Sequence, residues 1–202
     1  RDTNCPMRSL LLAVLFTAPM FAAGGWTAIR PSKTFDGWRI EGKGDWKSER
    51  GEISARQGPG NTGGDIFTER QWTDFEAELE FWMSSPGNSG LWFRVSKDQP
   101  GYQVDFIDEP DWPNVYSGSL YCMGKAFIAK NGDASTIRKN GWNKLRVRVK
   151  GDSIVIVMNG KTVVDIRDST FPKAGSLGLQ VHQGKVVNGM SVRVRKFRVR
   201  EI

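Results

Sequence analysis

The feature that most constrains the fold is a strict alternation of apolar and polar residues in short segments. In segment 74–83 (DFEAELEFWM), apolar residues occupy every second position, and Glu76, Glu78, Glu80 and Trp82 fill the positions between them. A period of two is that of a β-strand with one buried face. The chain has no convincing long helical pattern, so this periodicity predicts an all-β protein.

The same reasoning applies along the rest of the chain. Asn159-Gly160 joins two alternating runs, which predicts a tight hairpin because both residues tolerate positive φ. The alternation slips at Arg195-Lys196, which predicts a bulge. Loops are expected at 57–64, 84–90, 110–115 and 124–140. Short strands are expected at 34–38, 51–55, 65–68, 74–83, 91–95, 101–108, 117–122, 141–149, 153–158, 161–166, 175–183 and 191–201. Regular short strands and turns predict a jelly-roll sandwich of two antiparallel sheets.

The net charge of +7 is spread along the strands. Arg146, Arg148, Arg198 and Arg200 alternate with apolar residues, as on the solvent face of an antiparallel sheet. A nucleic-acid-binding protein clusters its basic residues on a recognisable reading element. We therefore expect no nucleic-acid partner, and at most weak attraction to anionic surfaces.

The first residues resemble a secretory signal peptide. Met7-Arg8 precedes a short apolar run over 9–18, and Pro19 to Gly25 supplies small residues, with cleavage expected near Ala22 to Gly24. The run is too short for a comfortable membrane span. We expect upstream residues and signal peptide over 1–24, one jelly-roll domain over 25–202, and a periplasmic or extracellular protein.

Two cysteines are present, Cys5 and Cys122. Only Cys122 falls in the predicted mature domain, which predicts no internal disulfide and no cysteine-based zinc site. No cysteine stands directly after the apolar run, where a lipid anchor would be attached, so we expect no stable membrane anchor after signal cleavage.

Strand parity predicts one functional face. If the apolar residues of segments 91–95, 101–108 and 175–183 point into the core, their neighbours point outward. Such a polar and aromatic face suits a sugar, which needs a ring to stack on and planar groups to bond its hydroxyls. The outward residues are Trp92, Arg94, Gln103, Asp105, Gln180 and His182.

Several segments together resemble the 3-keto-disaccharide hydrolase family, in the order DFEAELEFWMSSPGNSGLWFR, GYQVDFIDEP, SGSLY, GWNKLRVRVKGDSIVIVMNGKTVVD and GSLGLQVHQGKVV. The resemblance spans about 35–202. It implies a concanavalin A-like jelly roll, an exported protein, and activity on glycosides oxidised at C3 of a sugar ring. The family commonly has Glu after the Gly-Tyr pair and Gln two positions later, where this chain has Gln103 and Asp105. Either the carboxylate has moved along the same face, or catalysis is lost and a binding domain remains.

The resemblance and the residue types together imply a mechanism. A C3 ketone acidifies the C2 proton, so a base can remove it, the C1 substituent can leave, and water can add. The hypothesis takes His182 or Asp105 as base and Arg94 or a metal to polarise the ketone. Asp108 or Tyr121 would protonate the leaving group. The predicted substrate-binding residues are Trp82, Trp92, Gln103, Gln180 and Asn88.

Two further acidic groups leave alternatives open. Glu76, Glu78 and Glu80 have the spacing of a retaining glucanase pair, but a solvated strand face explains them as well. Asp108, Glu109 and Asp111 supply oxygen ligands of the kind calcium prefers, and no other cofactor is expected. The leading function is cleavage of a 3-keto-glycoside. The alternatives are a non-catalytic carbohydrate-binding module and, third, a conventional endoglucanase.

Overall fold

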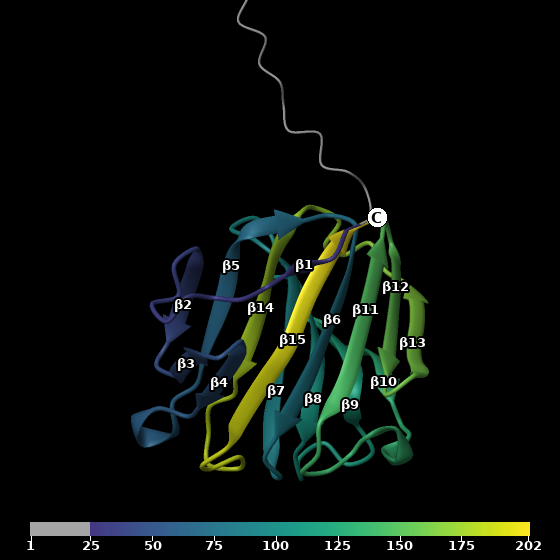
Figure 1. Cartoon of the computed structure of the whole chain (residues 1–202). Coiled ribbons are helices and arrows are strands. Elements are labelled where there is room, and N and C mark those ends of the chain that lie inside the picture. The colour runs from purple at the N-terminus through teal and green to yellow at the C-terminus, as the bar shows by residue number, and fades with distance from the viewer. Residues whose placement is uncertain (1–24) are drawn as a thin grey trace, which may run out of the picture.

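The computed structural model describes residues 25–202, which form a sandwich of two antiparallel sheets (Figure 1). The signal peptide predicted over 1–24 lies outside the described residues. Within 25–202, no helix has both the length and the apolar character needed to cross a bilayer. The expected all-β jelly roll is confirmed.

The first sheet has eight strands, in the order β13-β12-β11-β6-β15-β4-β3, with β1 added beside β15. Its strands are β1 (Thr27–Ala28), β3 (Asp45–Glu49), β4 (Glu52–Arg56), β6 (Phe75–Met83), β11 (Asn143–Lys150), β12 (Ser153–Met158), β13 (Lys161–Arg167) and β15 (Ser191–Glu201).

The second sheet has seven strands, in the order β10-β9-β8-β7-β14-β5-β2. Its strands are β2 (Trp38–Gly42), β5 (Gly64–Trp72), β7 (Gly87–Val95), β8 (Tyr102–Asp108), β9 (Tyr116–Cys122), β10 (Ala126–Asn131) and β14 (Gly175–Val181). Two 3₁₀ turns, Pro59–Asn61 and Ala134–Thr136, lie in the connections.

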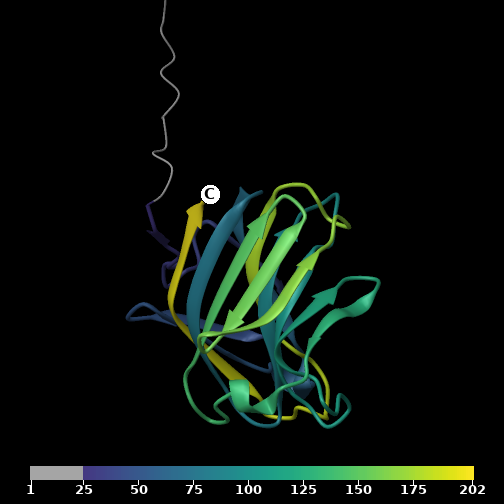
Figure 2. The same ribbon diagram turned by 90° about the vertical axis from the view of Figure 1, so that its right-hand side faces the viewer.

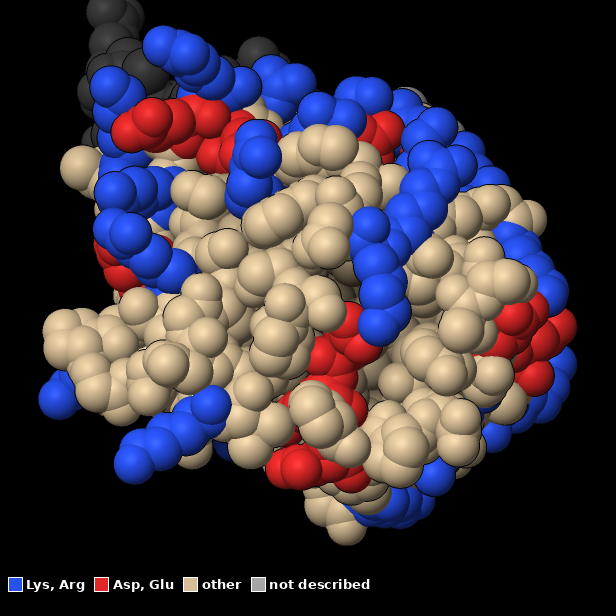
Figure 3. Space-filling model, turned by 90° about the horizontal axis from the view of Figure 1, so that it is seen from below, with Lys and Arg blue, Asp and Glu red and all other residues tan. Residues whose placement is uncertain are grey.

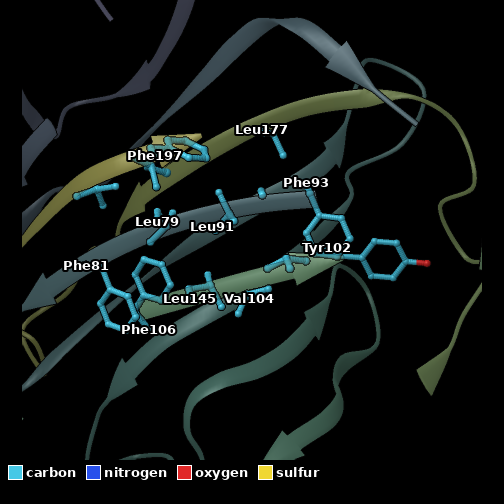
Figure 4. Packing of buried hydrophobic residues seen from close by; sticks show 14 of the residues in the cluster. Leu79, Phe81, Leu91, Phe93, Tyr102, Val104, Phe106, Leu145, Leu177 and Phe197 are labelled. Carbon is cyan, nitrogen blue, oxygen red and sulfur yellow. The ribbon is translucent and has the colours of Figure 1, made fainter. Parts of the chain in front are cut away.

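The core lies between the sheets and consists of the alternating apolar residues. Figure 4 shows Phe81 of β6 facing Phe106 of β8, and their rings stack with centroids 3.8 Å apart. Leu91, Phe93 and Val104 are fully buried beside them. Burying these side chains supplies most of the stabilisation of the fold, at about 1.5–3 kcal/mol for each large side chain.

Two turn predictions are confirmed. Asn159 and Gly160 have φ of 50° and 90° and join β12 to β13. The register of β15 against β6 shifts between Arg195 and Arg198, and Lys196 has a φ of 53°, so the predicted bulge is present.

Three local predictions were wrong. Segment 34–38 is mostly turn, because Phe35 and Gly37 have positive φ and the strand starts only at Trp38. Strand β7 already begins at Gly87, inside the expected loop 84–90. The expected loop 124–140 contains β10, an edge strand whose irregular pairing with β9 leaves no alternation to read.

Candidate functional site

The site lies on the outer face of the seven-stranded sheet, where β8, β7 and β14 are adjacent. The predicted core residues of these strands, including Leu91, Val104 and Leu179, are buried between the sheets. Parity therefore sends their neighbours outward. A groove is lined there by Asn88, Trp92, Gln103, Asp105, Trp112, Tyr121, Met123, Phe127, Gln180 and His182.

The floor of the groove consists of rows of residues that are paired across neighbouring strands. Trp92 pairs with Gln103, and Gln103 pairs with Tyr121. In the adjacent row, Gln180 pairs with Gly90, and Gly90 pairs with Asp105. Gly90 is required here, because a Cβ at this position would lie 2.6 Å from Gln103 Cγ. Its absence lets the Gln103 side chain lie flat on the sheet.

Asp105 is the most buried acid of the groove, with 4% of its surface exposed. Burial, and then the nearby charge of Glu109, raise the pKa of Asp105 well above its usual value. The Gln103 amide lies 2.8 Å from Asp105 Oδ1 and 3.2 Å from Trp92 Nε1. If the Gln103 nitrogen faces Asp105, it donates to the ionised carboxylate. If the Gln103 oxygen faces Asp105, it accepts from the protonated carboxylic acid. Asp105 can therefore hold or release a proton.

Asp65 of β5 is a second acid of this site, and sequence reasoning missed it. Trp92 Nε1 donates to Asp65 Oδ1 over 2.8 Å, and Asp65 pairs with Gln180 across the sheet. Burial raises the pKa of Asp65 to about 6, against the lowering effect of the Trp92 hydrogen bond. The signal was present in the sequence, because Ile66 is apolar and Asp65 must then face outward.

His182 directly follows β14 at one end of the groove. Its backbone N–H donates to Asn88 O over 3.2 Å, and Gln57 Nε2 donates to its carbonyl over 3.0 Å. His182 Nδ1 lies 2.7 Å from Gln183 O. A carbonyl oxygen only accepts, so Nδ1 carries a proton and Nε2 is the nitrogen that can take one up.

Seven of the predicted site residues are thus brought together: Asn88, Trp92, Gln103, Asp105, Tyr121, Gln180 and His182. Asn88 Nδ2 also donates to Glu109 Oε2 over 2.7 Å, which connects the loop after β8 to the groove. Trp112, Met123 and Phe127 line the groove without having been predicted, because they lie outside the regularly alternating segments.

Arg94 does not face the groove, contrary to the parity prediction. Its φ of 56° turns the backbone at the end of β7, and only 1% of its surface is exposed. Its guanidinium donates to the carbonyl oxygens of Thr73 over 3.0 Å and Gly151 over 2.8 Å. Arg94 therefore holds loops together at the other end of the sandwich and is not available to polarise a substrate ketone.

Trp82 and Asp108 also lie outside the groove. Trp82 belongs to β6 of the eight-stranded sheet, where it pairs with Arg193. Asp108 is three residues from Asp105, so strand parity turns its side chain away from the groove. It accepts from Ser85 Oγ over 2.5 Å and from Lys139 Nζ over 3.0 Å. Ser85, Lys139 and Asp108 line a separate small pocket.

Asp108, Glu109 and Asp111, the acids considered as calcium ligands, do not converge on one point, and an ordinary acidic loop explains them. Figure 3 shows the molecule from below, with one acidic group near the middle of this face and the remaining acidic and basic side chains mostly toward its rim. Lys139 pairs with Asp108 and Asn88 binds Glu109, so the two carboxylates are separately engaged. Among residues 25–202, no three His, Cys, Asp or Glu side chains are placed to hold a metal ion.

The three glutamates of β6 face the opposite surface, and each is ion-paired. Arg146 and Arg200 bind Glu76, Arg198 binds Glu78, and Arg195 and Lys196 bind Glu80. Burial raises the pKa values of Glu76 and Glu80, but hydrogen bonds from their basic partners outweigh it and lower both. A carboxyl held ionised in this way is unsuited to be the acid of a glucanase pair.

Comparison with known proteins gives the family. The model of the family described as "3-keto-alpha-glucoside-1,2-lyase-like domain" matches residues 25–200. The chain belongs to this family. A 3-keto-disaccharide hydrolase of Bacteroides thetaiotaomicron is 30% identical over 175 residues, which cover 71% of this chain and 59% of the relative. The chain thus spans about three-fifths of the length of that curated relative.

Solved structures share the fold of this family member. A structure described as a putative glycosyl hydrolase from Parabacteroides distasonis has a TM-score of 0.65 and 19% identity, covering 89% of this chain and all of the other. The carbohydrate-binding module CBM66 from Bacillus subtilis has a TM-score of 0.60 and 20% identity, covering 82% and 96%. A protein with a galectin-like fold from Bacillus subtilis has a TM-score of 0.69 and 13% identity, covering 88% and 94%. These likenesses show the jelly-roll fold.

Proposed function

We propose that this protein cleaves glycosides oxidised at C3 by eliminating the C1 substituent and hydrating the product. The observation that carries the proposal is a pair of acids: Asp105, which lines the groove together with His182, and Asp65, which accepts a hydrogen bond from the groove residue Trp92. Among the described residues, neither acid forms an ion pair with a lysine or arginine. Acids left without a cation partner in a groove are typical of catalytic sites. Family membership supplies the class of substrate.

The residues support one assignment of roles. His182 Nε2 removes the proton from C2, and the electron pair of that C–H bond forms the C1–C2 double bond as the C1–O bond breaks. Asp105, in its protonated form, gives its proton to the departing oxygen. Water then adds: its hydroxyl bonds to C1, its remaining proton goes to the ionised Asp105, and His182, whose imidazolium proton has exchanged with solvent, gives a proton to C2. The amides of Gln103, Gln180 and Asn88 are the groups available to bond the ketone and the hydroxyls.

The test uses methyl glucoside oxidised at C3 and its unoxidised form. We expect methanol release from the oxidised form only, and deuterium at C2 of the product in heavy water, because the C2 proton is exchanged during elimination. His182→Ala is expected to lower kcat/KM by about 10²–10⁴-fold. The matched control is Asp108→Asn, which changes an acid outside the groove and should retain activity. Hydrolysis without deuterium at C2, or full activity in His182→Ala, would contradict the mechanism.

A second candidate is a non-catalytic carbohydrate-binding module. It is favoured by Gln103, which stands where the resemblance leads us to expect a Glu, and by the likeness to CBM66. In that case the same groove would bind both the oxidised and unoxidised sugars, and neither would release its aglycone. We further propose that the protein is exported, on the strength of the apolar run over 9–18; N-terminal sequencing of the secreted product tests this.

A further inference from the structure

One wall of the groove is almost entirely apolar. It comprises Trp112 from the loop after β8 and Tyr121, Met123 and Phe127 from the β9–β10 hairpin; these four residues are termed the aromatic wall. Figure 2 shows this hairpin, in green, projecting from the side of the sandwich. Trp112 and Met123 are 40% and 39% exposed, although large apolar side chains are normally covered. The wall therefore presents apolar surface that the fold itself does not bury.

The rings of the aromatic wall are held in place before any ligand binds. Phe127 meets Trp112 and Tyr121 edge-to-face, with centroid distances of 5.2 and 5.7 Å. The Trp112 backbone closes a turn in which its N–H donates to Glu109 O over 3.1 Å. Edge-to-face contact fixes the rings without stacking them on one another. Flat ring surface therefore remains available in a preformed wall.

The polar groups of the groove lie on its floor instead. Asn88, Gln103, Asp105, Gln180 and His182 come from β7, β8 and the end of β14, and they provide the hydrogen-bonding groups that a sugar ring needs. The wall offers ring faces and a thioether, with a phenol and an indole N–H as its only polar side-chain groups. A second sugar there could stack on the rings but would find only two polar side-chain groups for its hydroxyls, whereas a flat apolar group would need none.

We infer that the aromatic wall binds a flat, apolar aglycone, so that the preferred substrates are aryl glycosides oxidised at C3 rather than disaccharides. This inference rests on the proposed function, since it assigns the glycone to the floor and the leaving group to the wall. The reaction is the elimination described above. C2 loses its proton to His182, the C1–O bond breaks, and the aryloxide takes the proton of Asp105 and leaves as a phenol.

The experiment compares three substrates oxidised at C3, in both anomers: methyl glucoside, phenyl glucoside and a glucosyl-glucose disaccharide. A phenol is a better leaving group than methanol in any enzyme, so only the part of the preference that depends on Trp112 is informative. Trp112→Ala is expected to lower the phenyl-to-methyl ratio of kcat/KM by about tenfold, through a higher KM for the phenyl glycoside. The matched control, Trp26→Ala, makes the same change just before β1, where Trp26 packs against Arg198 of the eight-stranded sheet, and should leave the ratio unchanged.

The outcomes separate this inference from the proposed function. If Trp112→Ala impairs the disaccharide as much as the phenyl glycoside, the wall binds sugar and the inference is overturned. If it impairs neither, the wall binds no aglycone. If the protein turns over no substrate, the proposed function fails, and binding of unoxidised phenyl glucoside then decides the inference by calorimetry. Binding that is tighter than for methyl glucoside, and that Trp112→Ala weakens, supports the apolar subsite; equal binding overturns it.

Discussion

At the scale of single residues, the acids of the two outer sheet faces differ in how their charge is balanced. Glu76 and Glu80 have arginine and lysine partners, whereas Asp65 and Asp105 have none among the described residues. Burial therefore raises the pKa of Asp105 and brings that of Asp65 to about 6. Keeping such a group costs folding stability at neutral pH, and selection tolerates that cost chiefly at functional sites.

Asp65→Asn is expected to stabilise the fold at pH 7.5. The unfolded acid ionises above its usual value of 3.8 and the folded acid only above about 6, so the ionised form disfavours folding. The gain should be near zero below pH 4, grow between pH 4 and pH 6, and level off at up to about 3 kcal/mol. Urea unfolding at pH 4 and pH 7.5 measures it.

The control for this comparison is Asp165→Asn, which changes an exposed acid on β13 and should shift stability by less than about 0.5 kcal/mol. A loss of stability in Asp65→Asn that grows with pH would mean that the ionised carboxylate is favoured. Turnover measured on the same sample separates the effect of Asp65 on stability from its effect on activity. We expect the variant to gain stability and lose activity, because the asparagine oxygen can still accept from Trp92 Nε1 but the ionisable carboxyl group is gone.

At the scale of elements, the groove depends on glycines that let side chains lie close to the sheet. Gly90 of β7 accommodates Gln103 in the groove, and at Gly178 of β14, which pairs with the groove residue Trp92, a Cβ would lie 2.4 Å from the Phe67 ring. Neither glycine has a positive φ, so close approach rather than turn geometry explains them. The floor of the groove is therefore shaped by the absence of side chains as much as by their presence.

Gly90→Ala is expected to weaken substrate binding more than it weakens the fold. The added Cβ would lie 2.6 Å from Gln103 Cγ, and Gln103 is a flexible side chain that can move aside. Moving it breaks the contacts with Asp105 and Trp92, so KM should rise by about tenfold or more. Gly132→Ala, where nothing lies within 4 Å, is the matched control. When Gln103 is already replaced by alanine, adding Gly90→Ala should change KM little. An equal rise in KM with and without Gln103 would mean that the added Cβ clashes with another residue.

Strand parity predicts much of this site but not all of it. It places Trp92, Gln103, Asp105, Gln180 and His182 on one face, because β8, β7 and β14 are regular and adjacent. It fails for Arg94, whose positive φ reverses the direction of the side chain. It also cannot assign Trp82 to a sheet, because alternation within one strand carries no information on which strands become neighbours.

The aromatic wall was beyond sequence reasoning for a different reason. Trp112 sits in a loop and Phe127 in an edge strand whose pairing with β9 is irregular, so neither follows a period. What brings them to the groove is the outward course of the β9–β10 hairpin, a tertiary feature. Asp65 was missed although its parity was readable, since only the sheet order places β5 beside β14.

At the scale of the whole molecule, the two outer faces of the sandwich have opposite electrostatic characters. The eight-stranded sheet has a lattice of ion pairs between β6, β11 and β15, reinforced by Arg195 over the Trp142 ring at 3.8 Å and Arg198 over Trp26 at 4.5 Å. The seven-stranded sheet has the groove with its unpaired acids. Ionised carboxyl groups therefore stabilise the fold on the outer face of the eight-stranded sheet and destabilise it on the outer face of the seven-stranded sheet.

This difference predicts opposite pH dependences for the two sheets. Glu76 has only 5% of its side chain exposed; burial raises its pKa, but the hydrogen bonds from Arg146 and Arg200 outweigh burial and lower it below 4.5. A lowered pKa means stability that is present above pH 4.5 and lost as the pH falls through the folded pKa. Glu76→Gln should therefore destabilise the fold by about 1–3 kcal/mol at pH 7 and progressively less below pH 4.5.

Urea unfolding of Glu76→Gln at pH 7.0, 4.5 and 3.5 measures this loss, with Glu69→Gln as a control at an exposed position of β5. The pH profile should run opposite to that of Asp65→Asn. Relative to the unsubstituted protein, Glu76→Gln loses most unfolding free energy at neutral pH, where Asp65→Asn gains most. Because the two sites lie on different sheets and share no partners, the double variant should show the sum of both effects at each pH. A neutral-pH gain in Glu76→Gln would mean that desolvation of this carboxylate outweighs its arginine partners, and the assignment of the eight-stranded sheet as the stabilising face would be withdrawn.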